Sequence, residues 1–153
     1  MNKTSPAHDS QVPRRGRAVA RPPGRVEVTQ LRNQAFAVFV RDHELTVDQP
    51  AEAGGDNEGP TPVELFVASL ASCVAYYAGR FLQRHHLPYE RLRVKADFTM
   101  ADDRPARVAS VRMRVLLPVE LNPDQQQALR AVVGHCTVHN TLRQPPEVTV
   151  ELG

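Results

Sequence analysis

The sequence has little cysteine and lacks the start of a secreted protein. Only two of its 153 residues are cysteines, Cys73 and Cys136. The charged N-terminal region is not followed by the apolar segment of about 7–15 residues that a secretory signal requires. We therefore expect a cytoplasmic protein whose two cysteines do not form a disulfide framework of the secreted kind. In a reducing compartment, such cysteines are either inert core residues or chemically active ones.

The sequence also lacks a large excess of charge, which argues against a nucleic-acid partner. Its formal net charge is +2 at pH 7, and residues 1–25 hold six basic residues against one acidic residue. The remainder is slightly negative and offers no basic surface to a phosphate backbone. Because residues 1–25 also contain four prolines and few large apolar side chains, we expect a disordered basic arm followed by a single domain over residues 26–153.

Several segments alternate between apolar and polar residues, as antiparallel strands do. Short β-rich stretches within residues 26–47 predict a hairpin inside a three-stranded sheet. Residues 92–100 and 111–117 alternate clearly and predict a second hairpin, with one buried face and one wet face. A final strand is predicted from the last apolar alternation: Val148, Val150 and Leu152.

A long apolar helix is the most clearly marked element. Residues 51–60 carry three glycines and predict a loop. Thr61, Pro62 and Glu64 follow as a capping box, with proline at the first helical position. The stretch that continues to about His86 is apolar on almost every side, so we expect a partner subunit to help bury it. Four polar residues interrupt this stretch and argue against a membrane span: Glu64, Ser69, Ser72 and Arg80.

Cys73 lies in the middle of this predicted helix. On an ideal helix its face also carries Phe66, Tyr76 and Tyr77, which form an apolar and aromatic patch. Burial in such a patch raises the pKa of a thiol. A reactive Cys73 therefore needs a cation or a hydrogen-bond donor from another part of the fold.

Cys136 is expected at the start of a short helix. Residues 122–124, Asn-Pro-Asp, predict the beginning of a preceding helix that ends near Gly134. Free amides and the helix dipole favour a thiolate at the helix start that follows. A cysteine that ionises and a second buried cysteine suit a redox pair. One thiolate attacks an O–O bond, and the resulting sulfenic acid condenses with the other thiol.

Two other kinds of site remain open from the residues alone. His135, Cys136 and His139 could bind zinc, with Cys73 as a fourth ligand. A cysteine–histidine hydrolase dyad that uses His139 is also conceivable. No oxyanion-hole feature or third orienting residue stands out in the sequence to support it.

Two segments resemble the cysteine motifs of the OsmC/Ohr family: GPTPVELFVASLASC at residues 59–73 and HCTVHNTL at residues 135–142. The predicted order of elements is similar to that family from about residue 26 to the end. The resemblance implies an α+β OsmC-like fold, with antiparallel sheets packed around a long cysteine-bearing helix in an interwoven homodimer. It also implies a thiol-dependent peroxidase that reduces organic hydroperoxides with an external dithiol such as dihydrolipoamide and needs no bound cofactor.

The resemblance also suggests roles for individual residues. By motif position, Cys73 would be the peroxidatic thiol and Cys136 the resolving one. Arg32 falls where the family carries an arginine, and its charge could supply the cation that Cys73 lacks. Val63 stands where the peroxidases carry the glutamate that pairs with this arginine.

Two departures from the family pattern, at positions 63 and 137, bear on the strength of the peroxidase. Glu64 lies one position after the family's glutamate and on the opposite side of the helix from Cys73, so capping is its expected role. Thr137 replaces the proline usual after the second cysteine. The alternative is therefore a non-catalytic OsmC-like protein that binds a small apolar ligand at the dimer interface, in a pocket lined by Phe66, Tyr76 and Tyr77.

Overall fold

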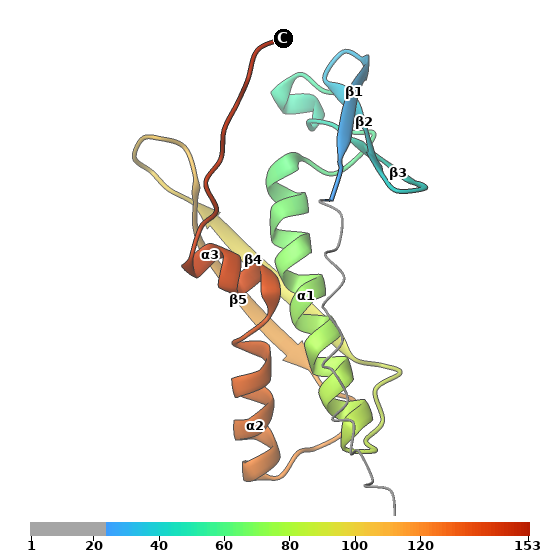
Figure 1. Ribbon diagram of the computed structural model, residues 1–153, viewed down its shortest axis with the longest axis vertical. Coiled ribbons are helices and arrows are strands. Elements are labelled where there is room, and N and C mark those ends of the chain that lie inside the picture. Colours follow the sequence, from blue (N-terminus) through green and yellow to red (C-terminus); the bar gives the residue numbers. More distant parts are fainter. Residues whose placement is uncertain (1–23) are drawn as a thin grey trace, which may run out of the picture.

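The computed structural model describes residues 24–153 (Figure 1). The predicted basic arm lies almost entirely outside the described residues. A single turn of 3-10 helix, Ala51–Ala53, precedes the long helix. The longer elements follow in this order: β1 (Glu27–Arg32), β2 (Ala35–Val40), β3 (His43–Val47), α1 (Pro62–Arg84), β4 (Arg93–Met100), β5 (Val108–Leu116), α2 (Pro123–Val133) and α3 (Thr137–Arg143).

The first three strands form the predicted antiparallel sheet in the order β1-β2-β3. This sheet lies beyond the N-terminal end of α1, apart from the second hairpin (Figure 1). Ala35, Ala37 and Val47 are buried in it. Many of its larger apolar side chains remain exposed in the single chain: Val26, Val28, Leu31, Phe36 and Phe39. The sheet therefore presents more apolar surface than the described part of this chain covers.

Helix α1 begins as predicted. The Thr61 side chain accepts the N–H of Glu64, the Glu64 side chain accepts the N–H of Thr61, and Pro62 is the first helical residue. The helix ends at Arg84, and His86 takes a left-handed conformation with φ of 54°. By length and composition alone α1 could cross a membrane, a property that core helices of soluble proteins share.

Within the single chain, α1 is buried on one side only. Its buried residues recur every three or four positions and form one stripe: Val67, Leu70, Val74, Ala78, Phe81 and Leu82. The opposite face, which includes Ala68, Ser72 and Tyr76, is exposed. The reason is that the β4–β5 hairpin, α2 and α3 all pack on one side of the helix.

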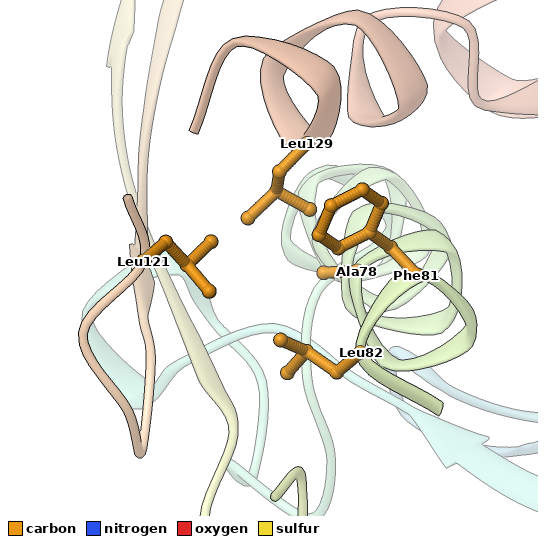
Figure 2. Close-up of a cluster of buried hydrophobic side chains, with 5 residues drawn as sticks. All are labelled: Ala78, Phe81, Leu82, Leu121 and Leu129. Atoms are coloured by element: carbon orange, nitrogen blue, oxygen red, sulfur yellow. The ribbon is translucent and has the colours of Figure 1, made fainter. Parts of the chain in front are cut away.

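The β4–β5 hairpin crosses behind α1, and α2 runs beside the C-terminal half of α1 (Figure 1). Figure 2 shows the cluster of buried side chains where these elements meet: Ala78, Phe81, Leu82, Leu121 and Leu129. Each large apolar side chain buried in this way contributes about 1.5–3 kcal/mol to folding. The Asn122 side chain caps α2 in a second capping box, as the sequence predicts.

The predicted final strand is not formed. Beyond α3, residues 145–153 have no regular structure, and Val148, Val150 and Leu152 are 79%, 82% and 98% exposed. The red tail in Figure 1 runs away from α3 without pairing with β4 or β5. An alternating pattern makes a strand only where a neighbouring strand supplies hydrogen bonds, and residues 24–144 offer the tail none.

Candidate dithiol site

Helices α1 and α3 bring the two cysteines together. Cys73 lies on α1 and Cys136 immediately precedes α3, and both are free thiols. They belong to one apolar cluster, whose buried core also includes Leu70 and Val74. Within this cluster, the Cys73 side chain packs against the buried core that contains Cys136. Residues 63 positions apart in the sequence thus meet at one point of the fold.

The two thiols differ in exposure, and the difference reverses the sequence-based expectation. Cys136 is fully buried and Cys73 is only partly buried. Burial raises the pKa of the Cys136 thiol, although the backbone N–H of His139 donates to its sulfur at 3.4 Å and opposes the shift. The prediction that a helix start makes Cys136 the readily ionised cysteine is therefore wrong. Loss of hydration outweighs the helix-start amide, and Cys73 is the thiol that a ligand can reach.

A second contact between α1 and α3 lies one helical turn beyond the cysteines. The Tyr77 hydroxyl is 3.1 Å from the Thr137 hydroxyl, and Thr137 directly follows Cys136. The Tyr77 ring packs edge-on against Tyr76, with ring centroids 5.5 Å apart. The Tyr76 hydroxyl has a different partner, because it accepts a hydrogen bond from Arg80 at 3.0 Å. The two neighbouring tyrosines therefore serve different contacts.

The predicted pocket residues are divided between two hollows. Phe66 lines an open apolar groove of about 700 Å³ between α1, β5 and α3, together with Val63, Leu70, Met113 and His139. Tyr76 and Tyr77 line a separate hollow of about 370 Å³ beside α2, together with three basic side chains: Arg80, Arg84 and His85. Within one chain, Phe66 and the two tyrosines therefore do not share a pocket.

Arg32, at the end of β1, forms an ion pair with Glu58 in the loop before α1. The hydrogen bond and the charge of Glu58 raise the pKa of the guanidinium. Glu64 does not take this role, because its carboxylate accepts the Thr61 N–H at 2.7 Å in the capping box. Glu58 was not predicted from the sequence as the partner of Arg32. The only signal for it is its acidic side chain in the loop before α1.

The loop that carries Glu58 is built around Asp48. This residue has no exposed surface, and its carboxylate accepts the backbone N–H groups of Gln49, Asp56 and Glu58 at 2.7, 3.0 and 3.1 Å. These hydrogen bonds, led by that from Glu58, lower the pKa of Asp48. The turn also needs glycine at position 59, because a Cβ there would lie 2.2 Å from the Thr46 carbonyl oxygen. The position of Glu58 is therefore fixed by its own backbone.

Arg32 does not join the thiols within one chain. The charged groups that act on it are Glu58, Asp56 and Asp48, all in the loop before α1. Cys73 lies eleven residues after Pro62, which is about 16 Å along the helix axis. The single chain thus holds a charged centre, the Arg32–Glu58 ion pair, near the N-terminal end of α1. It holds a dithiol centre, formed by the two cysteines, further along the helix.

Comparison with known proteins identifies the family. Residues 55–151 match the sequence profile described as "OsmC-like protein". The chain belongs to the OsmC-like family. No curated protein sequence matches it.

Solved structures have the same OsmC-like fold. A Psychrobacter arcticus protein, whose name associates it with osmotic stress and detoxification, is 23% identical and has a TM-score of 0.70, covering 76% of this chain and 85% of its own. A Legionella pneumophila organic hydroperoxide resistance protein OsmC is 19% identical, with a TM-score of 0.61 and coverage of 82% and 92%. A Vibrio cholerae protein with captopril bound in one of its active sites is also 19% identical, with a TM-score of 0.61 and coverage of 86% and 92%.

The family includes organic hydroperoxide resistance proteins, and this OsmC-like chain differs from the expected pattern in its carboxylate. Val63 lines the apolar groove, and Glu58, five residues earlier, is the partner of Arg32. The zinc hypothesis finds no support in the structure. Over residues 24–153, no three His, Cys, Asp or Glu side chains lie close enough together to hold a metal ion.

Proposed function

We propose that this OsmC-like protein reduces organic hydroperoxides, with Cys73 as the attacking thiol and Cys136 as the resolving thiol. The observation that carries the proposal is the packing of two free thiols, distant in the sequence, in one apolar cluster. Their unequal burial supports the division of roles. The partly buried Cys73 is open to a substrate, and the fully buried Cys136 is shielded from one.

The reaction would proceed through three balanced steps. The Cys73 thiolate attacks one hydroperoxide oxygen, the O–O bond breaks, and the alcohol leaves with a proton, so that Cys73 becomes a sulfenic acid. The Cys136 thiol then attacks this sulfur, an S–S bond forms, and water leaves. An external dithiol such as dihydrolipoamide exchanges with the disulfide and restores both thiols, ending as its own disulfide.

The apolar groove beside the thiols supports an organic rather than an inorganic hydroperoxide as substrate. Leu70 belongs both to the groove and to the cluster that holds Cys136. An alkyl or aryl group that lies against Phe66 and Met113 would therefore sit next to the cysteines. Burial of that group supplies binding energy that hydrogen peroxide cannot obtain.

We also propose that the protein acts as a homodimer in the cytoplasm. Apolar side chains of β1, the exposed face of α1 and the alternating apolar tail all lack cover from residues 24–153 of the single chain. A partner subunit that covers α1 could bring Arg32 and Glu58 to the Cys73 of the other chain. Two free thiols in contact also suit a reducing compartment.

The test follows loss of cumene hydroperoxide with dihydrolipoamide as the reductant. We expect turnover by the wild type, none by Cys73→Ser, and for Cys136→Ser a single consumption of hydroperoxide without disulfide formation. The absence of turnover in the wild type, or full turnover by Cys73→Ser, would contradict the proposal.

A second candidate function is the binding of a small apolar ligand without catalysis. The apolar Val63 in the wall of the groove favours it, because the groove then holds no carboxylate at the position where the family's peroxidases carry one. Titration with cumyl alcohol, the product of cumene hydroperoxide, tests this function. Binding that survives both Cys→Ser changes in a protein without turnover would support it over the first.

A further inference from the structure

Two contacts, one helical turn apart on α1, link the start of α3 to this helix. Cys73 and Cys136 pack in one apolar cluster, and the hydroxyl of Tyr77, one turn further along α1, hydrogen-bonds to that of Thr137, the residue after Cys136. The Tyr77 ring packs against the same apolar cluster as both cysteines. The hydroxyl pair therefore lies beside the sulfur pair rather than at a remote point of the helix contact.

Apart from the buried Cys136 and the half-buried Val138, which pack in the apolar cluster, the short helix α3 has few contacts in the described residues that fix its first residue. It spans seven residues, none of which is buried. The Cys136 sulfur caps it through the His139 N–H at 3.4 Å, which is a weak contact for a neutral thiol. Thr141 donates to the Thr137 carbonyl at 3.0 Å within the helix and does not link it to α1. The Tyr77 to Thr137 hydrogen bond at 3.1 Å is the polar contact in the described residues that locates this helix start on α1.

We propose that Tyr77 and Thr137 are positioning residues that hold Cys136 within disulfide reach of Cys73. The inference rests on the proposed function and adds residues to it. A disulfide forms only when the two Cα atoms lie within about 7 Å and the Cβ vectors face each other. A hydrogen bond on the residue next to Cys136 restricts the rotations of α3 that would turn its sulfur away.

Disulfide formation competes with further oxidation of the Cys73 sulfenic acid. Cys136 can convert the sulfenic acid of Cys73 to a disulfide, with release of water. If Cys136 is turned away, a second hydroperoxide molecule oxidises the sulfenic acid to a sulfinic acid and leaves as its alcohol. Loss of the hydroxyl pair should therefore slow disulfide formation and raise the yield of sulfinic acid, with no effect on the first attack by Cys73.

The experiment uses changes that remove one hydroxyl and little else. Tyr77→Phe and Thr137→Val each abolish the hydrogen bond, and Thr137→Ser keeps it. Tyr76→Phe is the matched control, because its hydroxyl bonds to Arg80 and not to α3. After one equivalent of cumene hydroperoxide, samples are quenched with an alkylating agent, and disulfide and sulfinic acid are measured by mass spectrometry.

We expect Tyr77→Phe and Thr137→Val to slow disulfide formation by about 2- to 10-fold, the effect of losing one hydrogen bond. The double variant should be no slower than either single one. Tyr76→Phe and Thr137→Ser should match the wild type. Equal disulfide rates in the wild type and Tyr77→Phe, or an equal loss in Tyr76→Phe, would overturn the inference.

A second oxidant separates this inference from the proposed function. Diamide converts two neighbouring thiols to a disulfide without any hydroperoxide chemistry. The wild type could fail to react with cumene hydroperoxide and still form the disulfide with diamide faster than Tyr77→Phe does. That result would contradict the peroxidase function and support the positioning role. Equal rates of disulfide formation with diamide in the wild type and in Tyr77→Phe would contradict the positioning role but not the peroxidase function.

Discussion

The two halves of the molecule are organised by different forces. Residues 27–60 form a small sheet and a loop whose fixed centre is polar, because Asp48 gathers three backbone N–H groups and Glu58 holds Arg32. The half that follows is organised by apolar packing of α1 against the second hairpin, α2 and α3. The first half carries the Arg32–Glu58 ion pair, and the second carries the two thiols. The proposed chemistry requires both, so each half can be perturbed while the other is observed.

Leu82→Ala should have the largest effect of the changes considered. Leu82 is fully buried in the cluster of Figure 2, and its loss leaves a cavity. We expect a loss of about 2–5 kcal/mol in the free energy of unfolding, measured by denaturant titration. The exposed Val150 is the control, and Val150→Ala should change this free energy by less than about 0.5 kcal/mol. Similar losses of unfolding free energy in both variants would contradict the conclusion that apolar packing stabilises this half.

Gly59→Ala should disturb the polar half by a smaller amount. The added Cβ would meet the Thr46 carbonyl carbon and oxygen, which are backbone atoms and cannot rotate away. We expect a loss of about 1–3 kcal/mol from this overpacking. Gly24→Ala is the matched control, because a Cβ there meets nothing within 4 Å. Equal melting temperatures of the two variants would show that the loop is not fixed as described.

The stability contribution of Asp48 should depend on pH. Its pKa is lowered in the folded state, so its contribution is present above the unfolded pKa, which is about 3.9, and is lost as pH falls through the folded pKa. Asp48→Asn should flatten the acid limb of the stability curve and speed hydrogen exchange at the Asp56 and Glu58 amides by about tenfold. Asp42→Asn, in the exposed β2–β3 turn, is the control. An unchanged acid limb in Asp48→Asn would refute this assignment.

Glu58→Gln should have the smallest effect on stability, because the ion pair is largely exposed. If the pair orients Arg32 for the Cys73 of a partner chain, the variant should slow the reaction of Cys73 with cumene hydroperoxide by about 2- to 10-fold. Asp97→Asn removes a similarly exposed ion pair on the second hairpin and should leave this rate unchanged. A rate in Glu58→Gln equal to that of the wild type would confine the charged centre to a structural role.

The sequence predicts features that depend on nearby residues. Thr61, Pro62 and Glu64 specify the start of α1 within four positions, and each hairpin follows from alternation along its own strands. The resemblance to OsmC/Ohr proteins singled out Cys73 and Cys136 together. The capping and alternation signals match the structure because the capping bonds and strand pairs that they describe are made within short stretches of chain.

Features that depend on distant residues were missed or misjudged. The ion pair of Arg32 with Glu58 joins residues 26 positions apart, and no local pattern marks Glu58 as the partner. The pKa of Cys136 was misjudged because the helix-start argument includes local dipoles but not the burial that tertiary packing imposes. The alternating residues of the tail predict a strand, but they cannot say which chain would pair with it.

The sulfur of Cys136 belongs at once to a helix cap and to a candidate disulfide. Its contact with the His139 amide starts the first turn of α3, and its contact with Cys73 lies on the proposed redox path. We therefore expect oxidation of this sulfur to change the backbone order of residues 137–143. The amide signals of α3 would report the oxidation state of the protein without any added probe.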